Sequence, residues 1–196
     1  MLSLTSQVAF LKRLGLPTRT ASQRKVSWEV FQYASAWHHF DAAAKKAGPL
    51  KADGVPGPKT EAHVRASMNH GYRIAPHFSL SEFTCHGAGH SHVSIEAALV
   101  KDLEDLRAKI GAITILNAYR CPAYNRQVGG ATNSAHMMWP AKAVDIRPHP
   151  KPATVKGLGF HGIGVRDTDN NSKTARVVVH LDHHPKTAVD TVFVDE

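Results

Sequence analysis

The sequence contains only two cysteines, Cys85 and Cys121, among its 196 residues. Two thiols are too few for a disulfide scaffold of the kind that small secreted domains use. A bond between them and two separate buried thiols are both compatible with the sequence, and buried thiols are the expected state for a chain made in a reducing cytoplasm. The segment 86–92, which follows the first cysteine, is interpreted as a solvated glycine-rich loop rather than as part of a Cys-His metal cluster.

Long apolar runs are also missing. No stretch approaches the ~20 apolar residues that a membrane-spanning helix requires, so no membrane partner is predicted. Residues 1–7 lack a continuous apolar segment and a small-residue cleavage site, and Lys12 and Arg13 follow soon after, so no signal peptide is predicted. The hydrophobic content of 42% is nevertheless sufficient for a packed core, and the length suits one medium domain and one small domain.

Acidic residues are scarce relative to basic ones. The chain has 16 Asp and Glu against 24 Lys and Arg, which gives a formal net charge of +8. A basic surface raises the encounter rate with polyanions. No nucleic-acid-binding motif accompanies the charge, so nucleic acid is not a predicted partner. Anionic polymers of another kind and a merely soluble basic protein both remain compatible with this charge.

The sequence does contain a set of metal-ligand side chains. His136, Asp145 and His180 arrive from separate segments and form the mixed nitrogen and oxygen set that holds a catalytic Zn²⁺, with one coordination position left open for water. The alternatives are a loop histidine, a strand-end carboxylate and a hydrogen-bonded core histidine, respectively.

Strand patterning explains how two of these side chains could meet. Residues 142–146 are predicted to form a short strand with Asp145 on one face. Residues 176–182 form a β-branched run that predicts a second strand, with Val178, His180 and Asp182 on one face. If the two strands are neighbours, Asp145 and His180 point to one place, and His136 is delivered from the preceding loop.

Several separated motifs surround the three candidate ligands. They are Tyr119–Arg126, Gly129–Ala131, Ser134–His136, Ala143–Asp145 and Val179–Asp182, preceded by His77–Phe83. Together these motifs resemble the M15 peptidases, which are zinc D-Ala-D-Ala carboxypeptidases and peptidoglycan L,D-endopeptidases found in many phage lysins. The resemblance covers roughly residues 76–182, and the agreement of several motifs in order is more specific than any one of them.

The resemblance implies roles for further residues. Zn²⁺ would be the cofactor, and the guanidinium of Arg120 would anchor an acidic group of the substrate, since its fork suits bidentate recognition of carboxylates. A structural ion pair is the alternative role for Arg120. Ser134 would either bind the substrate or orient the loop of His136.

Two departures from the family pattern matter for function. The aspartate follows the first histidine by nine positions instead of seven, through an insertion that contains Trp139 and Pro140, and this insertion is expected to bulge the loop beside the metal. In addition, Val177 stands where many members carry a catalytic acid. Asp182 is the nearest acid on the predicted face and is therefore the expected general base, with His183 and His184 as the next candidates.

The N-terminal part has a different pattern. Apolar residues at three- and four-residue steps predict a helix over residues 26–46, and a turn-rich stretch at 51–60 leads into a second helix at 61–69. The Asp-Gly-Val-x-Gly-Pro-Lys-Thr string within this stretch resembles small three-helix peptidoglycan-binding domains. The predicted domains are therefore residues 1–70 and 76–196, joined by a linker at 69–76. A helical appendage without wall-binding function is the alternative.

The remaining pattern places helices and strands around the candidate site. A helix with an apolar stripe runs from residue 95 to 110 with Ser94 as its cap. Another short helix begins at residue 123, and further strands are predicted at 113–116, 162–165 and 191–194, with a polar hairpin loop at 166–174. The predicted fold class is α+β, with a small antiparallel sheet and helices carrying the zinc site behind a small all-α domain.

These observations predict a zinc metallopeptidase that cleaves stem or cross-bridge peptides of bacterial peptidoglycan, as a phage endolysin or a virion-associated hydrolase. The expected partners are peptidoglycan and other virion proteins, and the expected location is the virion, or the host cytoplasm before lysis. The competing hypothesis is a non-catalytic tail or capsid protein that keeps the M15 fold and binds cell wall, motivated by the insertion and by Val177.

Overall fold

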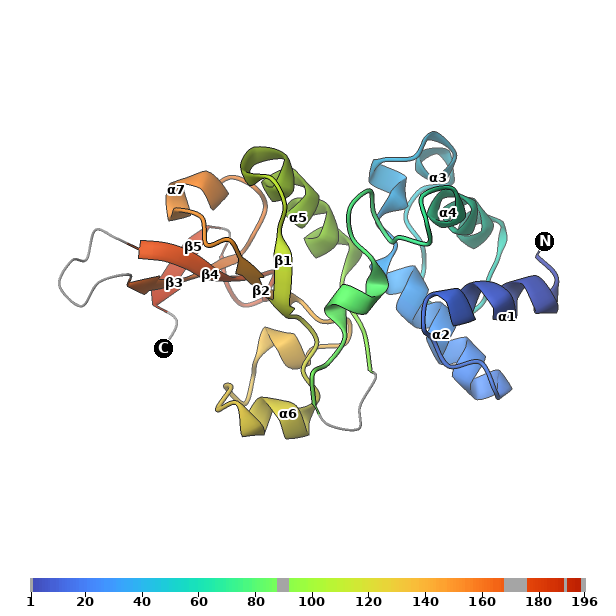
Figure 1. Cartoon of the computed structure of the whole chain (residues 1–196), viewed down its shortest axis with the longest axis horizontal. Coiled ribbons are helices and arrows are strands. Elements are labelled where there is room, and N and C mark those ends of the chain that lie inside the picture. The colour runs from blue at the N-terminus through green and yellow to red at the C-terminus, as the bar shows by residue number, and fades with distance from the viewer. Residues whose placement is uncertain (1, 88–91, 168–175, 189, 195–196) are drawn as a thin grey trace.

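The structure is a computed structural model that describes residues 2–87, 92–167, 176–188 and 190–194. The helices before residue 70 gather at one end of an elongated molecule, and a five-stranded sheet lies at the other end (Figure 1). The α+β class predicted from the sequence is confirmed. Most of the predicted hairpin loop at 166–174 and part of the glycine-rich loop at 86–92 lie outside the described residues.

The N-terminal part contains short helices rather than one long one. Its elements are α1 (Leu4–Arg13), α2 (Ala21–Ala34), η1 (Trp37–His39), α3 (Ala42–Ala47) and α4 (Pro58–Asn69). The predicted helix at 61–69 is confirmed as α4, but the single helix predicted over 26–46 is wrong. Asp41 does not continue α2; its carboxylate accepts hydrogen bonds from the backbone N–H groups of Ala43 and Ala44, both at 2.9 Å, and so caps a new helix.

The turn at Asp53 and Gly54 is fixed against α2. The amide of the buried Gln32 donates to the carbonyl of Val55 at 3.0 Å and accepts from the N–H of Gly54 at 2.9 Å. Gly54 has a φ of +72°, and a Cβ there would lie 2.5 Å from Cγ of Lys25. Glycine is therefore required for this close approach. The turn that resembles peptidoglycan-binding domains is thus a rigid part of the helical unit, and its binding function stays a prediction.

The segment predicted as a linker is packed. Ile74 and Ala75 are fully buried, and the backbone of Ile74 accepts from Ala36 and donates to Phe78, both at 3.0 Å. Phe31 of α2 and Leu99, which lies in the helix Ala97–Ile110 after this segment, belong to the same connected core. The two parts of the chain therefore share apolar contacts, and a domain boundary near residues 70–76 stays a prediction.

The C-terminal part is built on a mixed sheet. Its strands are β1 (Thr114–Asn117), β2 (Ala143–Arg147), β3 (Gly162–Asp167), β4 (Arg176–Asp182) and β5 (Thr191–Val194), in the order β1-β2-β4-β3-β5. The pairs among the first four strands are antiparallel as predicted, but β5 pairs parallel with β3. This difference arises because the chain, after β4, crosses back and enters beside β3 rather than forming a hairpin with its neighbour.

Helices cover the sheet and flank its loops. These elements are η2 (Leu80–Phe83), α5 (Ala97–Ile110), α6 (Pro122–Gln127), η3 (Ala135–Met137) and α7 (Pro152–Val155). The stripe of α5 joins the buried side chains of β2 and β3 in one core. The predicted cap of this helix is wrong, because the N-cap residue is Glu96 and the hydroxyl of the buried Ser94 makes no hydrogen bond among the described residues. Glu96 instead contacts Lys142 and His183.

A β-bulge decides which side chains of β4 face the core. Gly164 pairs with His180, but the next pair is Val165 with Val178, so Val179 is the extra residue. Val178 therefore packs into the core, while Val179 and His180 both line the open face. The prediction that Val178 shares a face with His180 is wrong for this reason, whereas His180 and Asp182 do share a face.

No helix within the described parts of the chain combines the length and the apolar character needed to cross a membrane.

Candidate metal centre

His136 is delivered by the η3 turn, as the sequence predicted. The hydroxyl of Ser134 caps this turn by accepting from the backbone N–H of His136 at 3.3 Å. The His136 ring is 2% exposed, and its Nδ1 lies 2.6 Å from the carbonyl of Ala118. Because a carbonyl can only accept, Nδ1 must carry the proton, and a neutral ring then presents a lone pair at Nε2.

Asp145 and His180 are supplied by adjacent strands. They are directly paired across β2 and β4, and both project from the face that Val144 and Ile146 do not use. The Nε2 of His180 lies 3.1 Å from Oδ2 of Asp182, so this nitrogen is the natural donor to the carboxylate. In a neutral ring, Nδ1 then carries the lone pair that can bind a cation.

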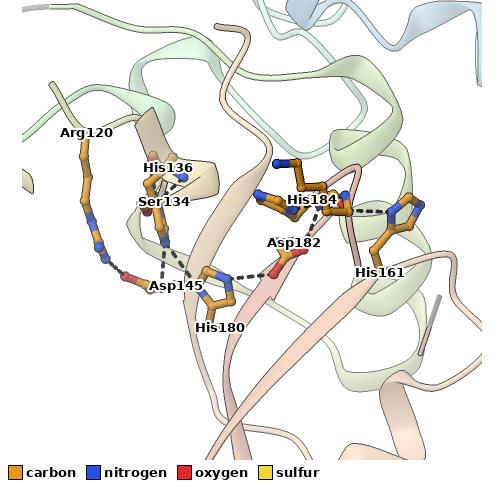
Figure 2. A network of polar contacts seen from close by, with 10 residues as sticks. Arg120, Ser134, His136, Asp145, His161, His180, Asp182 and His184 are labelled. Carbon is orange, nitrogen blue, oxygen red and sulfur yellow. Dashed lines mark hydrogen bonds and ion pairs between the residues drawn. The ribbon is translucent and has the colours of Figure 1, made fainter. Parts of the chain in front are cut away.

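The three side chains meet at one point, as Figure 2 shows. Nε2 of His136 lies 3.1 Å from Nδ1 of His180 and 3.2 Å from Oδ1 of Asp145, and these last two atoms are 3.0 Å apart. Two ligands at ~2.0–2.1 Å from a tetrahedral Zn²⁺ lie about 3.3–3.4 Å apart. The donor triangle therefore has nearly the size that such an ion requires.

Each candidate ligand is held by a further group. Ala118 fixes the ring of His136, Asp182 fixes His180, and a guanidinium N–H of Arg120 donates to Oδ2 of Asp145, which leaves Oδ1 at the centre. Figure 2 shows these contacts as a chain that runs from Arg120 through the triangle to Asp182. Metal-binding histidines are commonly oriented by a carboxylate or a carbonyl in this way.

The charges at the centre favour a cation. Burial raises the pKa of an isolated carboxyl, but the imidazoles of His136 and His180 beside it, of which His180 donates a hydrogen bond to it, hold the pKa of Asp145 well below its ordinary value. Burial also disfavours charge on His180, yet the hydrogen bonds to Asp145 and Asp182 raise its pKa to about 9. Burial lowers the pKa of His136, so this ring is neutral at pH 7. In the metal-free protein a proton on His180 thus takes the place that a metal ion would fill.

This arrangement predicts proton release on metal loading. With a pKa of about 9, His180 carries an extra proton at pH 7, and it must lose that proton from Nδ1 before it can bind Zn²⁺. We expect release of about one proton per zinc at pH 7 and progressively less release as the pH rises past the pKa of His180. Calorimetric titration in two buffers of different ionisation enthalpy measures this number. A proton count near zero at pH 7 would contradict the arrangement.

The structure shows which groups contact Arg120 and Asp182, two of the predicted catalytic residues. Arg120 is paired with Asp145, so the ion pair named as its alternative role is present, while its buried Nε makes no hydrogen bond among the described residues. Asp182 has both oxygens engaged, Oδ2 with His180 and Oδ1 with the backbone N–H of His184 at 2.7 Å. The substrate-binding role of Arg120 and the base role of Asp182 stay predictions.

Gly162 on β3 makes room for this carboxylate. A Cβ at Gly162 would lie 2.1 Å from Oδ2 of Asp182.

His183 and His184, the next two candidates for the general base, differ from each other in position. His183 is buried, with Nε2 2.9 Å from Asp102 and Nδ1 3.3 Å from Glu96, whereas His184 lines the open cleft.

A cleft of about 830 Å³ opens above the centre. Its lining includes the three candidate ligands, Arg120, Ser134, Asp182 and the loop Gly129–Ala131. Trp139, which belongs to the insertion, is not among the lining residues; its ring packs edge-on against Tyr119 at a centroid distance of 5.4 Å. The inserted Trp139 therefore packs outside the cleft lining, and the expected bulge of the loop beside the metal stays a prediction.

Sequence reasoning missed several residues that line the cleft. They are Arg147, His149, Arg166, Val179 and Thr187. Arg147 could have been found, because it lies two residues after Asp145 on the same strand and so shares its face. Arg166 follows the same alternation from Gly162. Val179 could not have been found, since it depends on the bulge.

Comparison with known proteins agrees with this geometry. A family model described as Peptidase M15 matches residues 76–182, a span that contains all three candidate ligands, Arg120, Ser134 and Asp182. No curated protein matches the chain significantly.

Proposed function

Because the chain belongs to the Peptidase M15 family, we propose that it is a zinc-dependent peptidase that cleaves peptides of bacterial peptidoglycan. The observation that carries this proposal is the donor triangle of His136, Asp145 and His180, whose sides are 3.0–3.2 Å, at the base of a cleft large enough for a peptide. When bound, Zn²⁺ would supply Lewis-acid polarisation of a peptide carbonyl and would make a water molecule more acidic.

The chain's own residues would prepare this centre. The carbonyl of Ala118 holds the proton of His136 at Nδ1, and the carboxylate of Asp182 holds the proton of His180 at Nε2, so that both rings point lone pairs at the same place. Arg120 orients the carboxylate of Asp145 and can present its remaining N–H groups to the cleft. We assign Asp182 as a positioning residue on these contacts, in place of the predicted base.

The general base would be one of the groups that face the cleft. Asp145 and Asp182 are the acidic residues among the described lining residues, and both are engaged. His184 lines the cleft close to Asp182. To act as a base its ring must carry a proton on Nδ1, which here accepts from the backbone N–H of Lys186 at 3.2 Å, and must present the lone pair of Nε2 to the cleft, so the role requires a change of tautomer. We propose His184 for this role.

The helical unit before residue 70 would hold the enzyme on the wall. This part of the proposal rests on the similarity of the Asp53–Thr60 string to peptidoglycan-binding domains and on the net charge of +8, which suits anionic wall polymers. Tethering raises the local substrate concentration without new contacts at the active site. A phage endolysin and a virion-associated hydrolase are both settings in which such a protein would act.

Digestion of purified cell walls tests the function. Zinc-loaded full-length protein is expected to release muropeptides that mass spectrometry identifies, and chelated protein is expected to release none until zinc is restored. Chelated protein should still sediment with the walls, because wall binding is assigned to the helical unit. Normal zinc binding without any release of muropeptides from the walls of several hosts would favour the competing hypothesis of a non-catalytic virion protein. The presence of Val177, where many family members carry an acid, supports that hypothesis.

A further inference from the structure

The cleft carries positive charge on one side of the candidate metal centre. Arg147 and Arg166 line it there, in addition to Arg120. Asp145 and Asp182 are the acidic side chains among its described lining residues, and their carboxylates are already held by the groups described above. The guanidinium groups of Arg147 and Arg166 form no ion pair with any acidic side chain that the structure describes. Both arginine side chains are exposed, on the face of the sheet opposite the hydrophobic core.

The strand register places these two arginines at the same end of the sheet. Arg147 lies two residues beyond Asp145 on β2, which corresponds to about 6.6–6.8 Å along the strand. On β3, Arg166 pairs with Val177, while Asp145 pairs with His180 on the strand between them. Arg147 and Arg166 therefore lie on either side of β4, both beyond the level of the Asp145–His180 pair, although at that level the N–H of Val178 bonds to the carbonyl of Pro150 and not to Arg147. Two strand spacings separate their backbones by roughly 10 Å, which two long side chains can span from both sides.

The bulge on β4 completes the floor between them. Val179 is turned to the open face by the bulge and lines the cleft between the two arginines. On β3 the positions on this face before Arg166 are Gly162 and Gly164, which are buried, and the space beside Gly162 is filled by the carboxylate of Asp182. An apolar floor with a cation on each side fits an extended peptide that carries an anionic group.

We propose that Arg147 and Arg166 form a subsite that holds a carboxylate of an extended peptide about two residues from the bond that lies at the metal centre. The distance follows from the rise of about 3.3 Å per residue in an extended chain, which matches the spacing of Arg147 from Asp145. The inference rests on the proposed peptidase function and names its substrate class: a peptide with a free carboxylate on one defined side of the cleaved bond.

The test uses two soluble muropeptide substrates that differ only in whether the peptide carboxylates are free or amidated. Wild-type protein is expected to cleave the free acid with a lower KM than the amide. In the Arg147→Gln/Arg166→Gln variant, the KM for the free acid should rise roughly 10-fold and approach that for the amide, because two exposed ion pairs are lost, while kcat changes less than about two-fold. The difference between the two substrates should also shrink at high salt.

A matched variant controls for net charge. Lys109→Gln/Lys156→Gln removes the same two charges from exposed positions outside the cleft lining and should leave both KM values unchanged. Equal KM values of the wild-type protein for the acid and the amide would overturn the subsite and leave the peptidase function standing. If the wild-type protein cleaves neither substrate, the affinity for the uncleaved peptides, measured by calorimetry, replaces KM as the readout. The wild-type protein is then expected to bind the free acid more tightly than the amide, and the arginine variant is expected to lose this preference. Equal binding of both forms by the wild-type protein would overturn the subsite.

Discussion

Replacement of His180 by alanine is expected to abolish stoichiometric zinc binding and, with it, the release of muropeptides. His180 provides one corner of a triangle of three donor atoms, so the variant loses roughly a third of a binding free energy on the order of 10 kcal/mol, or about 10²–10³-fold in affinity. His136→Ala should have the same effect, because its Nε2 is 3.1 Å from Nδ1 of His180 and points to the same place. Metal analysis after dialysis at pH 7 measures the loss.

His161→Ala is the matched control for these two variants. His161 is a half-buried histidine close to the site, but its Nδ1 bonds to the carbonyl of His184 at 3.1 Å and it does not belong to the donor triangle. This variant should retain one zinc per chain. A His180→Ala protein that still holds one zinc with wild-type affinity would place the metal elsewhere and would remove the basis of the proposed function.

Asp182→Asn separates two roles for the same carboxylate. If Asp182 orients His180 through Nε2, the variant should bind zinc roughly 10–100-fold more weakly and should regain much of its activity when zinc is in excess. If Asp182 is the general base, as the sequence alone suggested, zinc affinity should stay unchanged while kcat falls by ~10²–10⁴-fold at any zinc concentration. We expect the first result, because both oxygens of Asp182 are engaged away from the donor triangle. Competition with a chromogenic chelator gives the affinity, and muropeptide release gives the rate.

The replacement His184→Gln complements this measurement. His184 touches the cleft but none of the three donor atoms, so its loss should lower the rate without a change in zinc affinity. If Asp182→Asn loses rate alone and His184→Gln loses nothing, the base assignment returns to Asp182.

The candidate site was predictable from the sequence because its ligands lie on regular strands. Alternation of side chains placed Asp145 opposite the apolar Val144 and Ile146, and the same rule placed Asp182 beside His180. Alternation failed at Val178, because one extra residue in β4 reverses the faces of all residues before it. Nothing in a run of three valines indicates which of them is the extra one.

The errors in the fold have a common physical cause. Asp41 and Trp37 have the spacing of one helical face, but this spacing carries no information about capping. An aspartate can follow the end of one helix and cap the next. Likewise, the direction of β5 depends on where the chain returns after β4, which is a tertiary property. The predicted linker at 69–76 is packed, because Ile74 fills a core shared by both parts of the chain. Local pattern describes what a segment can form, and packing decides where it ends.

The close approach of Gly162 to Asp182 has a consequence for how this sequence can diverge. A methyl group at position 162 would meet a carboxylate that is held at both oxygens, so the two positions are not free to drift independently. Alanine at 162 becomes acceptable only in a chain whose residue 182 is smaller or turned away, and such a chain would need another means of orienting its second histidine. Among homologous proteins, these two positions should therefore change together, as a coupled pair whose members lie on paired strands and are separated by 20 residues of sequence.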